Sequence, residues 1–126
     1  MAVPVLKQGD YQIVSLQSSL SDAGWNQLME TLVGLVGKYR SKGVIVDLTA
    51  LDLLDSYGTR ILRNMVQMTK LRGAETVIVG LQPEVAFAMV QLGLMPGLRG
   101  IHMALDLEDG LAHLDQLIKR QASSDG

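Results

Sequence analysis

Short apolar runs bounded by glycine or aspartate recur along the chain and predict β-strands. The clearest is Val-Ile-Val at residues 44–46, which follows Gly43 and stops at Asp47, and a similar run covers residues 76–79. Continuous β-branched runs of this kind are typical of strands buried on both faces of a sheet. We therefore predict two central strands at these positions.

The first twenty residues have the pattern of a β-hairpin. Apolar segments at residues 3–6 and 11–16 flank Lys-Gln-Gly-Asp at residues 7–10, where the glycine is free to take a positive φ. Pro4 has no N–H to donate, so the first strand is expected at an edge of the sheet. A short last strand is predicted at residues 101–105, where apolar and less apolar residues alternate.

Four segments carry apolar residues at three- and four-residue spacing, which indicates amphipathic helices. Short polar side chains or a proline stand at their starts, where they favour helix initiation. The predicted helices cover residues 22–39, 56–72, 83–92 and 107–120, and one stripe of the second consists of Tyr57, Ile61, Met65, Met68 and Arg72. In the first helix, Gly34 and Gly37 each lower stability by roughly 1 kcal/mol relative to alanine, which close packing against a strand would explain.

This order of elements predicts the fold class. A hairpin followed by alternating helices and strands and a closing helix gives an α/β domain, with a mixed, mostly parallel sheet covered by about four helices. The 126 residues suffice for one such domain. We expect it to occupy residues 1–120 and to be followed by a disordered tail at residues 121–126, where Ala122 is the only apolar residue.

Composition narrows the possible functions. The net charge of −2 and the lack of a basic run argue against nucleic-acid binding, and the absence of cysteine excludes disulfides, thiol catalysis and cysteine-bound zinc. No apolar run approaches the roughly 18 residues of a membrane span, and the N-terminus lacks the pattern of a signal peptide. We expect a cytoplasmic protein that contacts neither nucleic acid nor membrane.

The candidate chemistry lies at the start of the second helix. Asp55 and Ser56 are both good N-cap residues, because a short side-chain oxygen can accept from the free N–H groups of the first turn. A serine here also presents its hydroxyl at an exposed helix start, placed by the strand behind it, as an acceptor for a phosphoryl group. The residues alone leave both interpretations open, a structural cap and a phosphorylation site.

Two enzyme-like alternatives lack parts of their machinery. A hydrolase nucleophile elbow needs glycine two residues before and after its serine, and here Leu54 takes the first place while only Gly58 matches. No base for Ser56 is evident, since His102 and His113 are the only histidines and are predicted on the last strand and the last helix. The sequence therefore argues against a serine hydrolase.

A receiver-like phosphoacceptor domain is the second of these alternatives. It would use Asp47 at the end of the buried strand, with Asp52 and Asp55 as magnesium ligands. The acidic pair after the first strand and the lysine after the last strand that receivers carry are missing. There is also no phosphate-binding glycine loop, and two histidines 11 residues apart make no zinc site, so we expect no cofactor and no metal.

The run around Ser56 resembles a known family. A buried strand ending in Asp47, a leucine-rich loop and then Asp-Ser-Tyr-Gly-Thr at residues 55–59 resemble the STAS domain of anti-anti-sigma factors, whose regulatory serine sits at this helix start. The resemblance covers about residues 3–120. Within the family, the run LDLLDSYGTR and the lack of a sensor domain are most similar to the small scaffold protein of the bacterial stressosome, the RsbS type.

This resemblance implies a non-enzymatic regulatory scaffold of a stress-response sigma-factor pathway. It would bind a serine/threonine kinase of the anti-sigma ATPase type, join larger sensor-bearing STAS proteins in a large hetero-oligomer, and release the kinase when phosphorylated. A stand-alone anti-anti-sigma factor that binds an anti-sigma kinase is the alternative. Ser56 would be the phosphorylated residue and Thr59 a weaker second acceptor, and the expected contact surface consists of Asp55, Ser56, Tyr57, Gly58, Thr59, Arg60 and Arg63.

Overall fold

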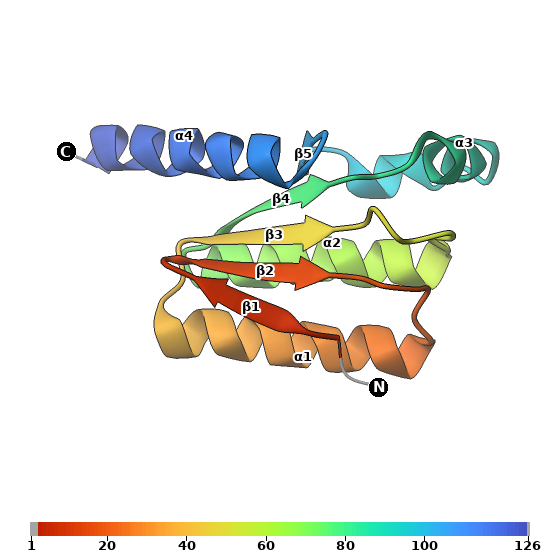
Figure 1. The fold of residues 1–126 in the computed structure, drawn as a ribbon, viewed down its shortest axis with the longest axis horizontal. Coiled ribbons are helices and arrows are strands. Elements are labelled where there is room, and N and C mark those ends of the chain that lie inside the picture. The colour runs from red at the N-terminus through yellow and green to blue at the C-terminus, as the bar shows by residue number, and fades with distance from the viewer. Residues whose placement is uncertain (1–2, 126) are drawn as a thin grey trace.

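The computed structural model describes residues 3–125 and confirms the predicted α/β class. This part of the chain forms five strands, four α-helices and one 3-10 helix (Figure 1). In chain order they are β1 (Val5–Gln8), β2 (Tyr11–Ser15), α1 (Asp22–Tyr39), β3 (Gly43–Asp47), α2 (Ser56–Leu71), β4 (Glu75–Val79), α3 (Pro83–Gln91), η1 (Met95–Leu98), β5 (His102–Ala104) and α4 (Leu107–Asp125).

The strands form one mixed sheet in the order β1-β2-β3-β4-β5. The predicted hairpin is present, with β1 antiparallel to β2 and Val5 opposite Val14, and all later neighbours are parallel. Ile45 at the centre of β3 pairs with Ile13 on one side and Val77 on the other. Because β2 to β5 are parallel, their carboxyl ends meet at one edge of the sheet, where α2 begins.

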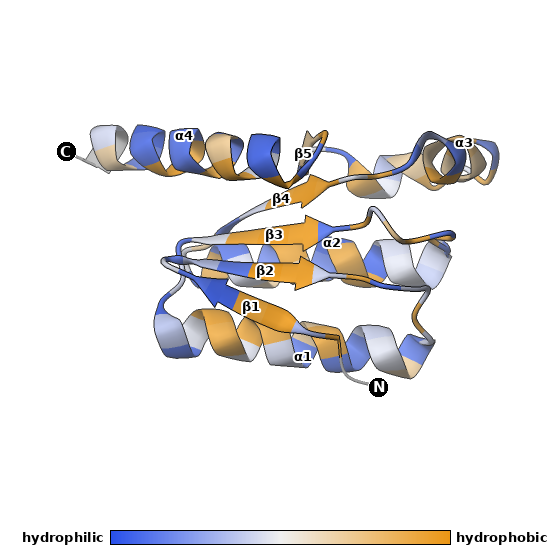
Figure 2. Ribbon diagram, viewed as in Figure 1, coloured by the Kyte–Doolittle hydropathy of each residue, from blue (hydrophilic) through white to orange (hydrophobic). Residues whose placement is uncertain are grey.

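Helices α1 and α2 cover one face of the sheet, and α4 runs along the other over β3 to β5 (Figure 1). Successive strand residues point to opposite faces, so the strands feed two cores. Figure 2 shows the apolar residues concentrated along the central strands. The larger core contains Val14, Val44, Val46, Ile78, Trp25, Leu28, Leu62 and Met65, and the smaller one contains Ile13, Ile45, Val77, Val79 and Leu114.

The buried face of α2 differs from the predicted stripe near its end. Met68 is 41% exposed, and Thr69 is fully buried instead. A polar residue can occupy this position because its hydroxyl is paired: Thr69 Oγ1 donates to the carbonyl of Met65 at 2.9 Å and lies 3.1 Å from Thr76 Oγ1 on β4. The close packing against a strand that was expected at Gly34 and Gly37 is also absent: no atom lies within 4 Å of a Cβ built on Gly34, and the near neighbour of Gly37 is the Arg72 side chain.

Helix α4 extends to Asp125, whereas the sequence predicted disorder from residue 121. Gln121 Nε2 donates to Glu75 Oε1 at 2.6 Å, which ties the extra turn to the sheet. The prediction relied on the polarity of the segment, which does not prevent these residues from continuing the helix of α4. Gly126 lies outside the described residues.

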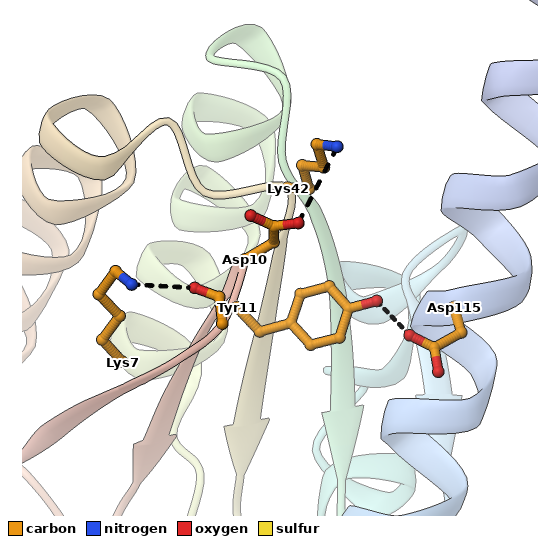
Figure 3. Close-up of polar contacts among 6 residues, drawn as sticks. Lys7, Asp10, Tyr11, Lys42 and Asp115 are labelled. Carbon is orange, nitrogen blue, oxygen red and sulfur yellow. Dashed lines mark hydrogen bonds and ion pairs between the residues drawn. The ribbon is translucent and has the colours of Figure 1, made fainter.

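Figure 3 shows the polar contacts at the end of the sheet opposite the start of α2, one of which holds α4 to β2. The Tyr11 hydroxyl donates to Asp115 on α4, and beside it Lys42 pairs with Asp10 at 3.9 Å. Lys7 closes the hairpin turn by donating to the carbonyl of Gly9 at 3.1 Å. Burial raises the pKa of the Tyr11 phenol, and the bond to Asp115 and the negative charges of Asp115 and Asp10 raise it further.

None of the helices within residues 3–125 has the length and apolar character needed to cross a membrane.

Candidate functional site

The loop between β3 and α2 is anchored by leucines at three-residue intervals. Leu48, Leu51 and Leu54 are all buried, and the Leu48 N–H donates to the carbonyl of Val79 at 2.9 Å, which continues the sheet beyond β3. Leu53 points the other way and is 51% exposed. The leucine-rich loop therefore fixes the position of the helix that follows.

Asp47 shapes this loop from the end of β3. Its Oδ1 accepts from the N–H of Thr49 at 2.9 Å and from the Thr49 hydroxyl at 2.6 Å. Gly80 at the end of β4 has φ +75°, and a side chain there would overlap Thr49. The carboxylate of Asp47 thus serves the turn, which argues against its use as a receiver-type phosphoacceptor.

Asp55 is the N-cap of α2 and Ser56 is its first residue. Asp55 Oδ1 accepts from the N–H of Gly58 at 2.7 Å, and its carbonyl accepts from the N–H of Thr59 at 2.9 Å and from the Thr59 hydroxyl at 2.7 Å. Ser56 is exposed, and within residues 3–125 its hydroxyl makes no hydrogen bond to the protein. Because Asp55 supplies the cap, the Ser56 hydroxyl is left free.

Neighbouring elements pack against the first turn of α2 on two sides. Trp25 of α1, only 2% exposed, lies against Gly58, where a Cβ would come within 2.8 Å of the indole Nε1. On the other side, Gly97 of η1 lies against the methyl group of Thr59, which is 3% exposed. The first turn is thus packed on two sides, whereas Ser56 is exposed.

Two arginines follow on α2 in different environments. Arg63 Nη1 donates to the carbonyls of Gly97 and Arg99, at 2.9 Å each, and so fastens η1 to the helix. The guanidinium of Arg60 is exposed and lies over the ring of Tyr57, 5.2 Å from its centroid. The hydroxyl of Tyr57 accepts in turn from Asn26 Nδ2 of α1.

The structure thus divides the seven residues expected to contact a partner. Asp55, Ser56 and Arg60 are exposed, Tyr57 and Arg63 are half-buried, and Gly58 and Thr59 are buried. Sequence reasoning missed the exposed Leu53 and the supporting residues Trp25, Asn26 and Gly97. A glycine in the first turn of a helix is one signal of a close neighbour that was available at Gly58.

The histidines lie away from Ser56. His102 on β5 and His113 on α4 face each other on the opposite side of the sheet, with ring centroids 5.1 Å apart. No base for the Ser56 hydroxyl comes from either ring. Among residues 3–125, no three histidine or acidic side chains gather in a manner suited to a metal ion.

Comparisons with known proteins agree with this arrangement. Residues 2–110 match the STAS domain family. A variant of RsbS from Moorella thermoacetica is 33% identical with a TM-score of 0.78, over 93% of this chain and 97% of that one. A chain from a structure of the stressosome, described as a signal integration and transduction hub, is 32% identical with a TM-score of 0.72, over 91% of this chain and 98% of that one.

A curated relative is a longer protein. The RsbT co-antagonist protein RsbRA of Bacillus subtilis (strain 168) is 26% identical over 92 residues, which are 73% of this chain. This chain spans only 33% of the length of that relative. The family match, the similarity to RsbS and the strand-loop-helix geometry around Ser56 lead to one conclusion: the chain belongs to the STAS domain family.

Proposed function

We propose that this protein is a non-enzymatic signalling subunit that binds a serine/threonine kinase through the surface around Ser56 and releases it once Ser56 is phosphorylated. The observation that carries the proposal is the exposed hydroxyl of Ser56 at a helix start that Asp55 caps in its place. In the reaction the kinase transfers the γ-phosphoryl group of ATP to Ser56 Oγ, ADP leaves, and the hydroxyl proton passes to solvent. The other candidate acceptor, Thr59, is buried and hydrogen-bonded to the carbonyl of Asp55.

The proposed switch is electrostatic. A phosphoserine adds about −1.5 to −2 charges, and the dipole of the helix favours it by about 1 kcal/mol. Asp52 and Asp55 oppose it, because two unit charges about 5 Å apart repel by roughly 3 kcal/mol at an effective dielectric near 20, before salt screening. The free protein can turn these side chains into water, but a bound partner would bury the phosphate beside the carboxylates. Phosphorylation should therefore weaken the complex more than the fold.

The relatives support the choice of partners. RsbRA is by its name an RsbT co-antagonist, and it is about three times as long as the segment it shares with this chain. The relative that is 32% identical comes from a structure of the stressosome. We infer that this chain joins larger STAS proteins in a hetero-oligomer that captures a kinase of the anti-sigma ATPase type.

The proposal is tested with the purified chain, the candidate kinase and ATP. Phosphorylation is mapped by mass spectrometry and the complex is followed by size-exclusion chromatography. We expect modification of Ser56 and dissociation of the kinase. Ser56→Ala should bind the kinase and retain it in the presence of ATP, whereas Ser56→Asp should bind weakly, with less effect than the more highly charged phosphate.

An exposed serine elsewhere supplies the matched control. Ser18→Ala, in the loop before α1, should leave both modification and release unchanged. Phosphorylation at another residue, or a complex that survives full modification of Ser56, would contradict the proposal. A large particle formed with a sensor-bearing STAS protein supports the scaffold, and a one-to-one complex with the kinase alone supports the stand-alone antagonist.

A further inference from the structure

Arg60 is an exposed cation one helical turn after Ser56. Both residues belong to α2 and both are exposed. Side chains four residues apart on a helix are neighbours, with Cβ atoms about 5–6 Å apart, and an anion that precedes a cation is the favourable order. A negative group on Ser56 would therefore lie within reach of the Arg60 guanidinium.

The guanidinium of Arg60 has no carboxylate partner in the unmodified protein. Within the part of the chain that the structure describes, Lys42 and Asp10 form the only ion pair closer than 4.0 Å. Arg60 instead lies over the Tyr57 ring, a weak contact at an exposed site. Arg63, the other arginine nearby, is already held by two carbonyl groups. Of these two arginines, Arg60 is the one whose guanidinium makes no hydrogen bond to the described residues 3–125, so it can turn to a new anion.

We infer that Arg60 is the intramolecular partner of the phosphate on Ser56. The planar fork of a guanidinium matches the oxygens of a phosphate, and charge-assisted bonds of this kind are the stronger ones. Asp55 cannot take this role, since it is negative and its carboxylate already caps the helix. Phosphorylation then moves Arg60 from the ring of Tyr57 to the phosphate.

This inference rests on the proposed function and adds a second cause of release. If Arg60 contacts the kinase before modification, the phosphate removes that contact as well as adding negative charge. The phosphate lies within one helical turn of Arg60 and binds its guanidinium. An acidic group of the kinase that had contacted Arg60 therefore loses this contact. Arg60 is thus a positioning residue for the phosphate and a contact residue for the kinase at different times.

The test needs phosphorylated protein but no kinase. Phosphoserine is incorporated at position 56 during translation, and the second pKa of the phosphate is measured by 31P NMR titration. Because Arg60 stabilises the dianion, Arg60→Ala should raise this midpoint by about 0.2–0.4 of a pH unit, the strength of an ion pair at this spacing. Arg60→Lys should raise it by less, since the charge is kept and the fork is lost.

Lys70→Ala is the matched control. Lys70 is exposed on the same helix, but it lies about 21 Å from Ser56 along the axis, beyond the screening length of about 8–10 Å. Its removal should leave the midpoint unchanged. Equal midpoints for the parent and Arg60→Ala, or an equal displacement by Lys70→Ala, would overturn the inference. Neither result would affect release on phosphorylation, which the kinase-binding experiment measures separately.

Discussion

The contact between Gly58 and Trp25 predicts that one methyl group will destabilise the protein. A Cβ on Gly58 would lie 2.8 Å from Nε1, 2.9 Å from Cε2 and 3.0 Å from Cζ2 of the indole. Non-bonded heavy atoms prefer separations of about 3.5–4.0 Å. In Gly58→Ala the indole must therefore move away by several tenths of an ångström, and Trp25 is buried in the main core.

The expected size of the effect is a balance of two terms. Overpacking a core typically costs about 1–3 kcal/mol, whereas replacing glycine by alanine in a helix gains at most about 1 kcal/mol. Gly58 is the third residue of α2, where the gain from helix propensity is smaller than in the interior. We expect Gly58→Ala to lower the free energy of unfolding by about 1 kcal/mol.

Gly34 provides the matched control for the same substitution. It is exposed in the interior of α1, and no atom lies within 4 Å of a Cβ built there. Gly34→Ala should therefore raise the free energy of unfolding by about 0.5–1 kcal/mol. The two variants should differ from each other by about 2 kcal/mol, with opposite signs relative to the parent.

Urea unfolding followed by tryptophan fluorescence measures both variants. Trp25 is the only tryptophan, so its emission also reports directly on the packing against Gly58. We expect the native-state emission to change in Gly58→Ala and to stay unchanged in Gly34→Ala. If the two variants are equally stable and Trp25 emits identically in both, the close approach of α1 to the start of α2 is refuted.

Three further predictions concern other contacts. The raised pKa of Tyr11 means that the folded protein keeps this proton above pH 10, where the unfolded chain loses it. The free energy of unfolding should therefore fall as pH rises beyond 10, by at most about 1.4 kcal/mol per pH unit from this group. Tyr11→Phe should remove that dependence, and the same pH profile in the parent and in Tyr11→Phe would contradict the prediction. Arg63→Met should destabilise the protein by about 1–3 kcal/mol through loss of the bonds to η1, and hydrogen exchange should accelerate most in η1. Gln121→Ala should cost about 1 kcal/mol and increase exchange in the last turn of α4, because Glu75 loses its donor; equal exchange in both proteins would argue against that contact.

The features predicted correctly from the sequence are those determined by residues close together in the chain. The run at residues 44–46 is β-branched, and Asp55 is a short polar residue before a helical pattern, so the strand and the start of α2 were expected where the structure has them. The hairpin and the parallel direction of the later strands also followed, because helices between the strands provide the crossover connections that parallel strands need. These features depend on residues close together in the chain.

The surface of the site depends on distant residues and was not predictable in the same way. Gly58 and Thr59 were expected to contact a partner, but Trp25 and Gly97 cover them from segments more than 30 residues away. The glycines of α1 show the same limitation, since nothing in the local sequence distinguishes the open surroundings of Gly34 from the close approach of the Arg72 side chain at Gly37. Periodicity indicates which residues share a helix face, whereas tertiary packing decides which of them remain exposed.

The two hydroxyls in the first turn of α2 have unequal access to a kinase because of this packing. Modification of Thr59 would require its hydroxyl to leave the carbonyl of Asp55 and η1 to move away from its methyl group. Modification of Ser56 requires neither, since Asp55 caps the helix in its place. The fold itself therefore favours one acceptor of the two, whatever sequence preference the kinase has. We expect Thr59 to become modified only after α2 separates from η1, so that weakening the Arg63 contacts should expose Thr59 while leaving Ser56 as accessible as before.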